Sequence, residues 1–192
     1  CAPSLPLYLK VWDAELPATV GTGQATLLIQ PFDASNVSAK PIGELYGWRS
    51  SQQIYVDSQA LANSLTSKFE RLLAMQGYTC KKGSWVGTPT GLKTVAPGYR
   101  AVISGTISQL RIDSEKQGVQ TVSRLRLTVD CLIGLPGQQT LLTRQVKISQ
   151  EQTHFLQEAS VLEDLLNQGL EEAATRLSAE LKKALSSSPA PE

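Results

Sequence analysis

The sequence predicts an α+β fold, a two-layer sandwich in which a mainly antiparallel sheet carries two helices on one face. Three observations favour it. Apolar and polar residues alternate over residues 99–150, as in an antiparallel sheet with one packed face and one wet face. Two stretches, residues 58–76 and 159–185, repeat apolar residues at three- and four-residue steps, as amphipathic helices do. No apolar run approaches the roughly 20 residues that a membrane-spanning helix needs.

The predicted elements follow in the order strand, helix, strand, three-stranded meander, helix. The first strand covers residues 24–30, and residues 32–51 are predicted to be a loop because Asp, Asn, Pro and Gly interrupt them. Asp57 or Ser58 can cap the first helix, and Gly77 ends it. Tyr78 then starts a short strand. Residues 83–98 follow it as an irregular stretch rich in Gly, Pro and Thr.

The meander begins with a long strand over residues 99–113. Its apolar phase slips between Ile107 and Leu110, which predicts a β-bulge. A polar turn at residues 115–118 leads to a second strand, and a turn at Pro136 leads to a third. In the second strand Leu125, Leu127, Val129 and Cys131 share one face, and Arg124, Arg126, Thr128 and Asp130 share the other.

The domain organisation is simple. Residues 1–23 hold three prolines and are predicted to be a tether and linker, in which the apolar patch 7–12 could add an edge strand. Residues 24–186 form a single α+β domain, and the Ser/Pro/Ala-rich residues 187–192 are predicted to be a disordered tail. A chain of 192 residues can bury about 70% of its unfolded surface, enough for one stable core.

Charge and chemistry exclude several function classes. Lys and Arg number 18 and Asp and Glu 17, whereas a nucleic-acid surface needs clustered cations. The single histidine, His154, has no identifiable catalytic or metal-binding partners, so we interpret it as a loop or capping residue. We therefore expect no enzyme, no metal, no cofactor and no nucleic-acid partner.

Cys1 is the first candidate functional residue. A bare cysteine at the start is what signal-peptide cleavage leaves on a bacterial lipoprotein, so we expect acylation of Cys1, for example by palmitate. The alternative is that Cys1 marks an arbitrary start of the sequence. Ala2 in place of an aspartate is typical of lipoproteins sorted to the outer membrane. The expected location is thus the periplasmic face of a Gram-negative outer membrane, with the lipid as anchor.

Cys80 and Cys131 remain once Cys1 carries the lipid. An even pair in an oxidising compartment predicts a disulfide between them. The alternative is two separate buried thiols that behave as small apolar side chains.

Five residues are candidates for partner binding. Tyr46, Trp48 and Trp85 are aromatic residues in Gly-rich segments, where exposed rings often mark contact surfaces. The alternative is that these rings fold back over a sheet end as apolar plugs. Arg124 and Arg126, with Arg144, are predicted to project from the exposed sheet face toward an anionic partner; the alternative is cross-strand pairing with acids.

Several short motifs carry a family resemblance. Cys1, the 27–33 stretch Leu-Leu-Ile-Gln-Pro-Phe-Asp, the Ile42-Gly43-Glu44 segment and a helix that ends in Gly77-Tyr78 resemble a group of small bacterial envelope lipoproteins. The group includes YajG-type lipoproteins, auxiliary lipoproteins of envelope ABC transporters and, more distantly, the lipopolysaccharide-assembly lipoprotein.

The resemblance implies a non-enzymatic accessory or assembly factor of an envelope transport or secretion machine, acting through protein–protein contacts. The alternative is a lipid- or glycan-binding lipoprotein with an apolar cavity between helices and sheet. An exposed strand edge or aromatic patch favours the first function, and such a cavity favours the second.

Overall fold

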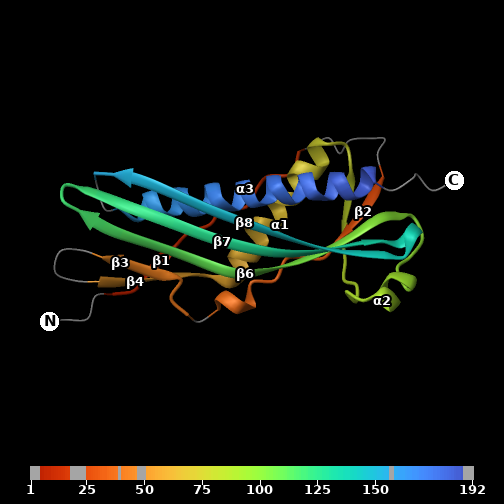
Figure 1. Ribbon diagram of the computed structural model, residues 1–192, viewed down its shortest axis with the longest axis horizontal. Coiled ribbons are helices and arrows are strands. Elements are labelled where there is room, and N and C mark those ends of the chain that lie inside the picture. The colour runs from red at the N-terminus through yellow and green to blue at the C-terminus, as the bar shows by residue number, and fades with distance from the viewer. Residues whose placement is uncertain (1–4, 18–24, 39, 47–50, 156–157, 188–192) are drawn as a thin grey trace.

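The computed structural model describes residues 5–17, 25–38, 40–46, 51–155 and 158–187. Within these ranges eight strands form one mixed sheet that is curled into a half-barrel, accompanied by three α-helices and two short 3-10 helices (Figure 1). None of the helices in these ranges is long and apolar enough to span a bilayer. The elements are β1 (Leu7–Leu9), β2 (Thr26–Ile29), η1 (Ser35–Val37), β3 (Gly43–Tyr46), β4 (Ser51–Val56), α1 (Ser58–Met75), β5 (Thr79–Lys82), α2 (Pro89–Lys93), β6 (Tyr99–Gln117), β7 (Gln120–Leu135), η2 (Pro136–Gln138), β8 (Thr140–His154) and α3 (Ala159–Ser186).

A long antiparallel meander of β6, β7 and β8 runs the length of the molecule (Figure 1). Gly118, with φ of 64°, makes the tight turn between β6 and β7, where an ordinary side chain would be strained. The register of β6 against β7 shifts between Ile107 and Gln109, so the bulge predicted from the apolar phase is confirmed.

The other edge of β6 holds two separate groups of strands. At one end β2 pairs in parallel with Tyr99–Ile103, and β5 pairs in parallel with β2. At the other end β3 pairs in parallel with Ser114 and Glu115, and β4 and β1 follow outward from β3. The 19 residues of β6 provide the length for both groups. One strand therefore joins two small wings that lie at opposite ends of the sheet.

The predicted fold class is wrong in its sheet and in its layering. Among the described residues four of the seven strand pairs are parallel, so the sheet is mixed rather than mainly antiparallel. It is also curled, and a third helix, α2, lies on the face opposite to the two long helices. Apolar alternation shows which face of a strand is buried, but it does not show the direction of the neighbouring strand. The predicted loop 32–51 is likewise wrong, because β3 lies within it.

Both predicted long helices are confirmed. Asp57 caps α1, because its Oδ1 accepts a 2.6 Å hydrogen bond from the Ala60 amide, and Gly77 follows the helix with φ of 90°. The helices α1 and α3 pack on each other and on one face of the sheet, which we call the inner face. A Cβ built on Gly169 would lie 2.1 Å from Cδ2 of Leu125 on β7. Helix α3 therefore lies directly on the sheet at this point, with no room for a ligand between them.

The opposite, outer face carries a second and smaller apolar cluster at the β2–β5 end. Leu28, Leu92 and Val102 are its buried members, and Trp85 packs against them. The helix α2, which begins with Pro89 after the Thr88 cap, brings Leu92 onto this face. The sheet is thus covered on both faces at this end.

Residues 10–14, here called the N-terminal strap, lie against side chains of both long helices. The Trp12 amide donates to Asn167 Oδ1 over 2.9 Å, and the Trp12 carbonyl accepts from Ser64 Oγ and from Lys68 Nζ, each over 2.7 Å. Asn167 Nδ2 also donates to the Lys10 carbonyl over 3.2 Å. Together with β1, which confirms the suggested edge strand, the strap attaches part of the predicted tether region to the folded domain.

Candidate binding sites

The outer edge of β8 is the longest open strand edge among the described residues. β8 is 15 residues long and pairs only with β7. The Lys147 carbonyl accepts a 3.0 Å hydrogen bond from Arg176 Nη1 on α3, so it points away from β7. Backbone groups on one edge of a strand come from alternate residues. The amides and carbonyls of Thr143, Gln145, Ser149 and Glu151 therefore face the same open edge.

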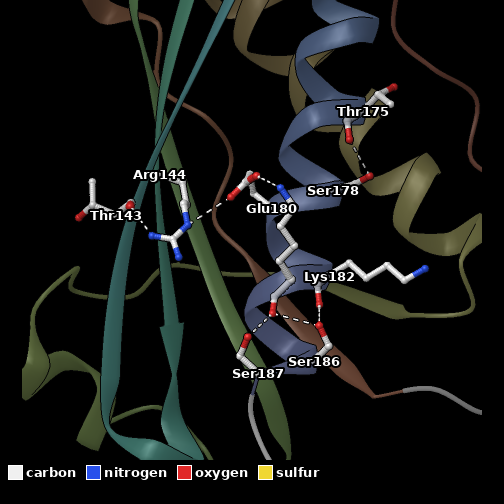
Figure 2. A network of polar contacts seen from close by, with 9 residues as sticks. Thr143, Arg144, Thr175, Ser178, Glu180, Lys182, Ser186 and Ser187 are labelled. Carbon is white, nitrogen blue, oxygen red and sulfur yellow. Dashed lines mark hydrogen bonds and ion pairs between the residues drawn. The ribbon is translucent and has the colours of Figure 1, made fainter.

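Helix α3 flanks this edge with charged side chains of both signs. Arg144 on β8 places Nε 3.3 Å from Glu180 Oε2, and Figure 2 shows its side chain lying between Glu180 and the Thr143 carbonyl. Further along α3, Arg176 pairs with Glu172. The hydrogen bond from Lys183, and then the nearby Arg144, lowers the pKa of Glu180, so this carboxylate is charged at neutral pH.

This arrangement is chemically suited to accept an extended peptide. An unpaired strand edge offers amides and carbonyls in a fixed pattern, to which a further strand can add. The side chains that border the edge can select the partner by charge. Arg176 and Arg144 already occupy the carbonyls of Lys147 and Thr143, as protected edges in soluble proteins often show.

The predicted aromatic residues do not form one surface. Trp48, like Cys1, lies outside the described residues. Tyr46 is 41% exposed at the end of β3, opposite Glu115 on β6. Trp85 packs near Gly134, which pairs with Val102 at the other end of β6. The 13 residue steps from Val102 to Glu115 on β6 correspond to roughly 40 Å.

Trp85 is a plug over the outer face of the sheet. A Cβ on Gly134 would lie 3.2 Å from Cη2 of the Trp85 ring and 2.3 Å from Leu92 Cδ2, so both side chains occupy the space that glycine leaves. The Trp85 amide is also bonded to Gln30 Oε1 at 3.2 Å. The alternative interpretation of this ring, as a packed plug, is therefore the one that the geometry supports.

The two predicted arginines occupy the exposed outer face of β7, but they differ in their contacts. Arg124 Nε lies 2.7 Å from Glu151 Oε2 on β8, and its Nη1 lies 3.9 Å from Glu115 on β6. This is the cross-strand pairing with acids that the sequence left open. Arg126 lies opposite Arg111 and Ser149. In the described part of the chain no hydrogen bond or ion pair of the Arg126 side chain is found. Arg144, expected on the same face, instead lies on the inner face and contacts α3.

The predicted disulfide is absent, because Cys80 and Cys131 are free thiols. Cys80 lies on β5 and Cys131 on β7, with β2 and β6 between them. Three strand spacings amount to about 14 Å, whereas a disulfide needs Cα atoms within about 7 Å. The alternative of two separate thiols therefore holds. Burial raises the pKa of each thiol to about 12, with a further contribution from Glu70 at Cys80.

Glu70 is a buried carboxyl on α1 beside β5. It is 3% exposed, and its Oε2 lies 3.4 Å from Lys82 Nζ without forming a hydrogen bond. Burial raises the pKa of Glu70, and the nearby Lys82 opposes that shift only in part. No local pattern singles out Glu70, because the helical period places polar residues at three- and four-residue steps without showing which of them other elements cover.

Ser123 and His154 form a pair that the sequence could not bring together. Ser123 Oγ lies 2.9 Å from His154 Nε2, and it donates to Ser114 Oγ over 2.9 Å. A serine beside a histidine is the arrangement that a nucleophile and its base require. Ser123 is 0% exposed, however, so its hydroxyl is out of reach of a dissolved substrate. The pair links neighbouring strands on the inner face. Across the described ranges no cluster of three or more His, Cys, Asp or Glu could hold a metal ion.

A second candidate site is a pocket of about 690 Å³ at the α2 end of the molecule, here called the end pocket. It lies where the loop after α2, the start of β6, the η2 turn and the last turn of α3 meet. Its lining includes the buried side chains of Leu92, Leu135 and Leu185. Of the described residues, 15 line it, and Lys93 and Arg100 are the only charged ones among them. The pocket is not the predicted cavity between helices and sheet, because it opens at the end of the sheet.

Comparison with known proteins identifies the fold but not a family. No protein-family model matches the chain, and no curated protein matches its sequence. Among solved structures, protein XCC0632 from Xanthomonas campestris, described under family model DUF330, superposes with a TM-score of 0.53 at 10% identity, covering 91% of this chain and 92% of that one. The hypothetical protein CT253 from Chlamydia trachomatis gives 0.50 at 8% identity, covering 81% and 96%. An uncharacterized protein gives 0.54 at 12% identity, covering 93% and 99%. The chain therefore has a fold that also occurs in bacterial proteins such as XCC0632 and CT253.

Proposed function

We propose that the protein is a non-enzymatic envelope lipoprotein that binds a partner protein by adding a strand of that partner to the open edge of β8. In this proposal it serves as an accessory or assembly factor of an envelope transport or secretion machine. Its acylated Cys1 anchors it to the periplasmic face of the outer membrane. The open edge of β8 is the observation that carries the proposal.

The edge supports binding because it combines length with a defined register. Its outward backbone groups come from alternate residues over Thr143–Glu151, enough for several consecutive inter-strand hydrogen bonds. The partner strand would have to displace Arg176 and Arg144 from the two carbonyls that they occupy. Both arginines keep their ion pairs with glutamates on α3, so the displacement costs little free energy. Arg126, next to Ser149, offers a positive charge to the partner on the outer face.

The lipid anchor would increase the effective concentration of the domain beside a membrane-bound partner, so that modest contacts suffice. A Cys1→Ser variant tests the anchor. It should appear in the soluble periplasmic fraction, and its retention on membranes would show that the lipid does not attach the protein.

Site-specific photo-crosslinking in cells tests the β8 edge. A photoreactive residue replaces Lys147 at the edge of β8 or, as a matched position, Lys81, an exposed lysine on the edge strand β5. We expect position 147 to crosslink to an extended segment of one envelope protein and position 81 to give no such product. The Ser149→Pro variant removes one outward amide without breaking the ladder to β7, and it should abolish the crosslink.

The control is Ser149→Ala, which alters the same side chain and keeps the amide. It should crosslink as the unmodified protein does, and the thermal transition should be similar in both Ser149 variants. Crosslinks that persist in Ser149→Pro, or that arise from position 81 instead of 147, would refute strand addition at β8.

A further inference from the structure

We propose that the end pocket binds an anionic alkyl amphiphile, a single hydrocarbon chain with a phosphate or carboxylate head. This site is separate from the β8 edge and does not depend on it. The volume of about 690 Å³ lies within the range of about 300–1,000 Å³ that is usual for small-molecule sites. The pocket is lined in part by α2, and α2 lies at the opposite end of the molecule from β1 (Figure 1).

The base of the end pocket suits a hydrocarbon chain. Leu92, Leu135 and Leu185 are each less than 5% exposed overall, yet all three contribute to the lining. Val95 and Pro97, from the loop after α2, add further apolar surface. A chain that enters the pocket exchanges contact with water for contact with these side chains, which is favourable in proportion to the apolar area that is covered.

The charge of the lining suits an anionic head. Both charged residues in the described lining, Lys93 and Arg100, are cations, and none of these 15 described residues is an acid. Arg100 Nη2 donates to the Leu185 carbonyl over 3.3 Å, which holds the guanidinium at the wall. A guanidinium carries five N–H donors, more than this single bond uses. Next to an apolar surface such cations attract an anion more strongly than they would in open water.

The two features together define the ligand class. A free phosphate ion would leave the apolar base without contacts, and an uncharged alkyl chain would leave Lys93 and Arg100 without an anion. An amphiphile with both parts satisfies both features. The sources of such a ligand are a lysophospholipid, with its phosphate, or a fatty acid, with its carboxylate.

Calorimetric titration of the full chain tests the site, with all probes below their micelle-forming concentrations. We expect dodecyl phosphate to bind with one-to-one stoichiometry, and inorganic phosphate and dodecyl maltoside to bind far more weakly. Dodecanoate and a lysophosphatidylglycerol are titrated in parallel. Tighter binding of the lysolipid indicates a membrane source, and tighter binding of dodecanoate indicates a fatty acid.

Three variants locate the binding. Lys93→Glu reverses one charge of the lining on an exposed side chain and should weaken dodecyl phosphate binding by about tenfold or more. Lys40→Glu makes the same charge change on an exposed residue outside the end pocket and should bind as the unmodified protein does. Gly137→Trp places a ring in the pocket from a position where a Cβ meets no atom within 4 Å, so it should block binding and preserve folding.

The proposal is overturned if dodecyl phosphate fails to bind, or if it binds no better than dodecyl maltoside. It is also overturned if Lys93→Glu and Lys40→Glu bind it equally well, or if the folded Gly137→Trp variant still binds it.

Discussion

Replacing Asn167 by alanine tests whether the N-terminal strap is part of the folded structure. Asn167 is 5% exposed, and it forms two hydrogen bonds to the strap, at the Trp12 amide and the Lys10 carbonyl. Each bond contributes about 1 kcal/mol, and the Trp12 amide left without its partner costs roughly 1 kcal/mol more. Alanine recovers about 0.6 kcal/mol through its higher helix propensity. The free energy of unfolding should therefore fall by about 2 kcal/mol, which corresponds to a decrease in Tm of about 4–8 °C.

Urea denaturation followed by circular dichroism measures this change, with Asn63→Ala as the control. Asn63 lies on α1, is exposed and accepts a 3.0 Å hydrogen bond from Gln59 Nε2, so its replacement should leave stability unchanged or slightly higher. Trypsin should also cleave after Lys10 faster in Asn167→Ala than in the control. If the two variants differ by less than about 0.5 kcal/mol, and their cleavage rates agree, the strap contributes nothing to the stability of the domain.

Two further predictions concern titratable groups. Thiol titration at pH 8 should find Cys80 and Cys131 almost unreactive in the folded protein, because burial raises the pKa of both to about 12 and the thiolate is the reactive form. Both thiols should react once the protein is unfolded without a reductant. If they stay unreactive under those conditions, Cys80 and Cys131 are joined by a disulfide and this prediction is wrong. For Glu70, whose pKa burial raises, the folded state holds its proton more tightly than the unfolded state. Stability contributed by this group is therefore lost as pH rises from about 4.3 through the raised pKa. Urea denaturation at pH 4.5 and at pH 7.5 measures this effect. The free energy of unfolding of Glu70→Gln, relative to that of the unmodified protein, should be higher at pH 7.5 than at pH 4.5. An equal difference at the two pH values would contradict a raised pKa of Glu70.

Local periodicity was sufficient to predict the elements whose burial repeats along the chain. In the helices α1 and α3 and in the three strands of the meander, buried residues recur at regular steps over many residues. The bulge near Ile107 was also visible, because the alternation of apolar and polar residues shifts there. The strand β4 was missed because only Ile54 and Val56 of its six residues are buried, which is too few to show an alternation. Parallel pairing was missed because it depends on contacts between distant segments, such as Leu27 with Ala101.

The candidate sites depended even more on long-range contacts. The alternation of apolar and polar residues identified the exposed face of β7. The acidic residues that pair with Arg124, however, come from the neighbouring strands β6 and β8. Trp85 was recognised as a notable ring, yet its environment is set by Gly134, 49 positions later in the sequence. No local pattern shows which strand ends a sheet, so the β8 edge could not be identified. The lining of the end pocket comes from four separate parts of the chain, so no single motif indicates it.

The length of β6 has a consequence for where a ligand can reside. The start of β6 lines the end pocket, and Ser114 and Glu115 pair with the wing that contains β1. The 14 residue steps from Arg100 to Ser114 span about 46 Å, comparable to the full thickness of about 40–45 Å of a lipid bilayer with its headgroups. Under the proposed attachment through Cys1, with β1 toward the membrane, the sheet would thus act as a rigid spacer that holds the end pocket away from the membrane surface. An amphiphile bound there would have left its own bilayer completely, and it would travel with the protein as cargo rather than as a lateral neighbour in the membrane.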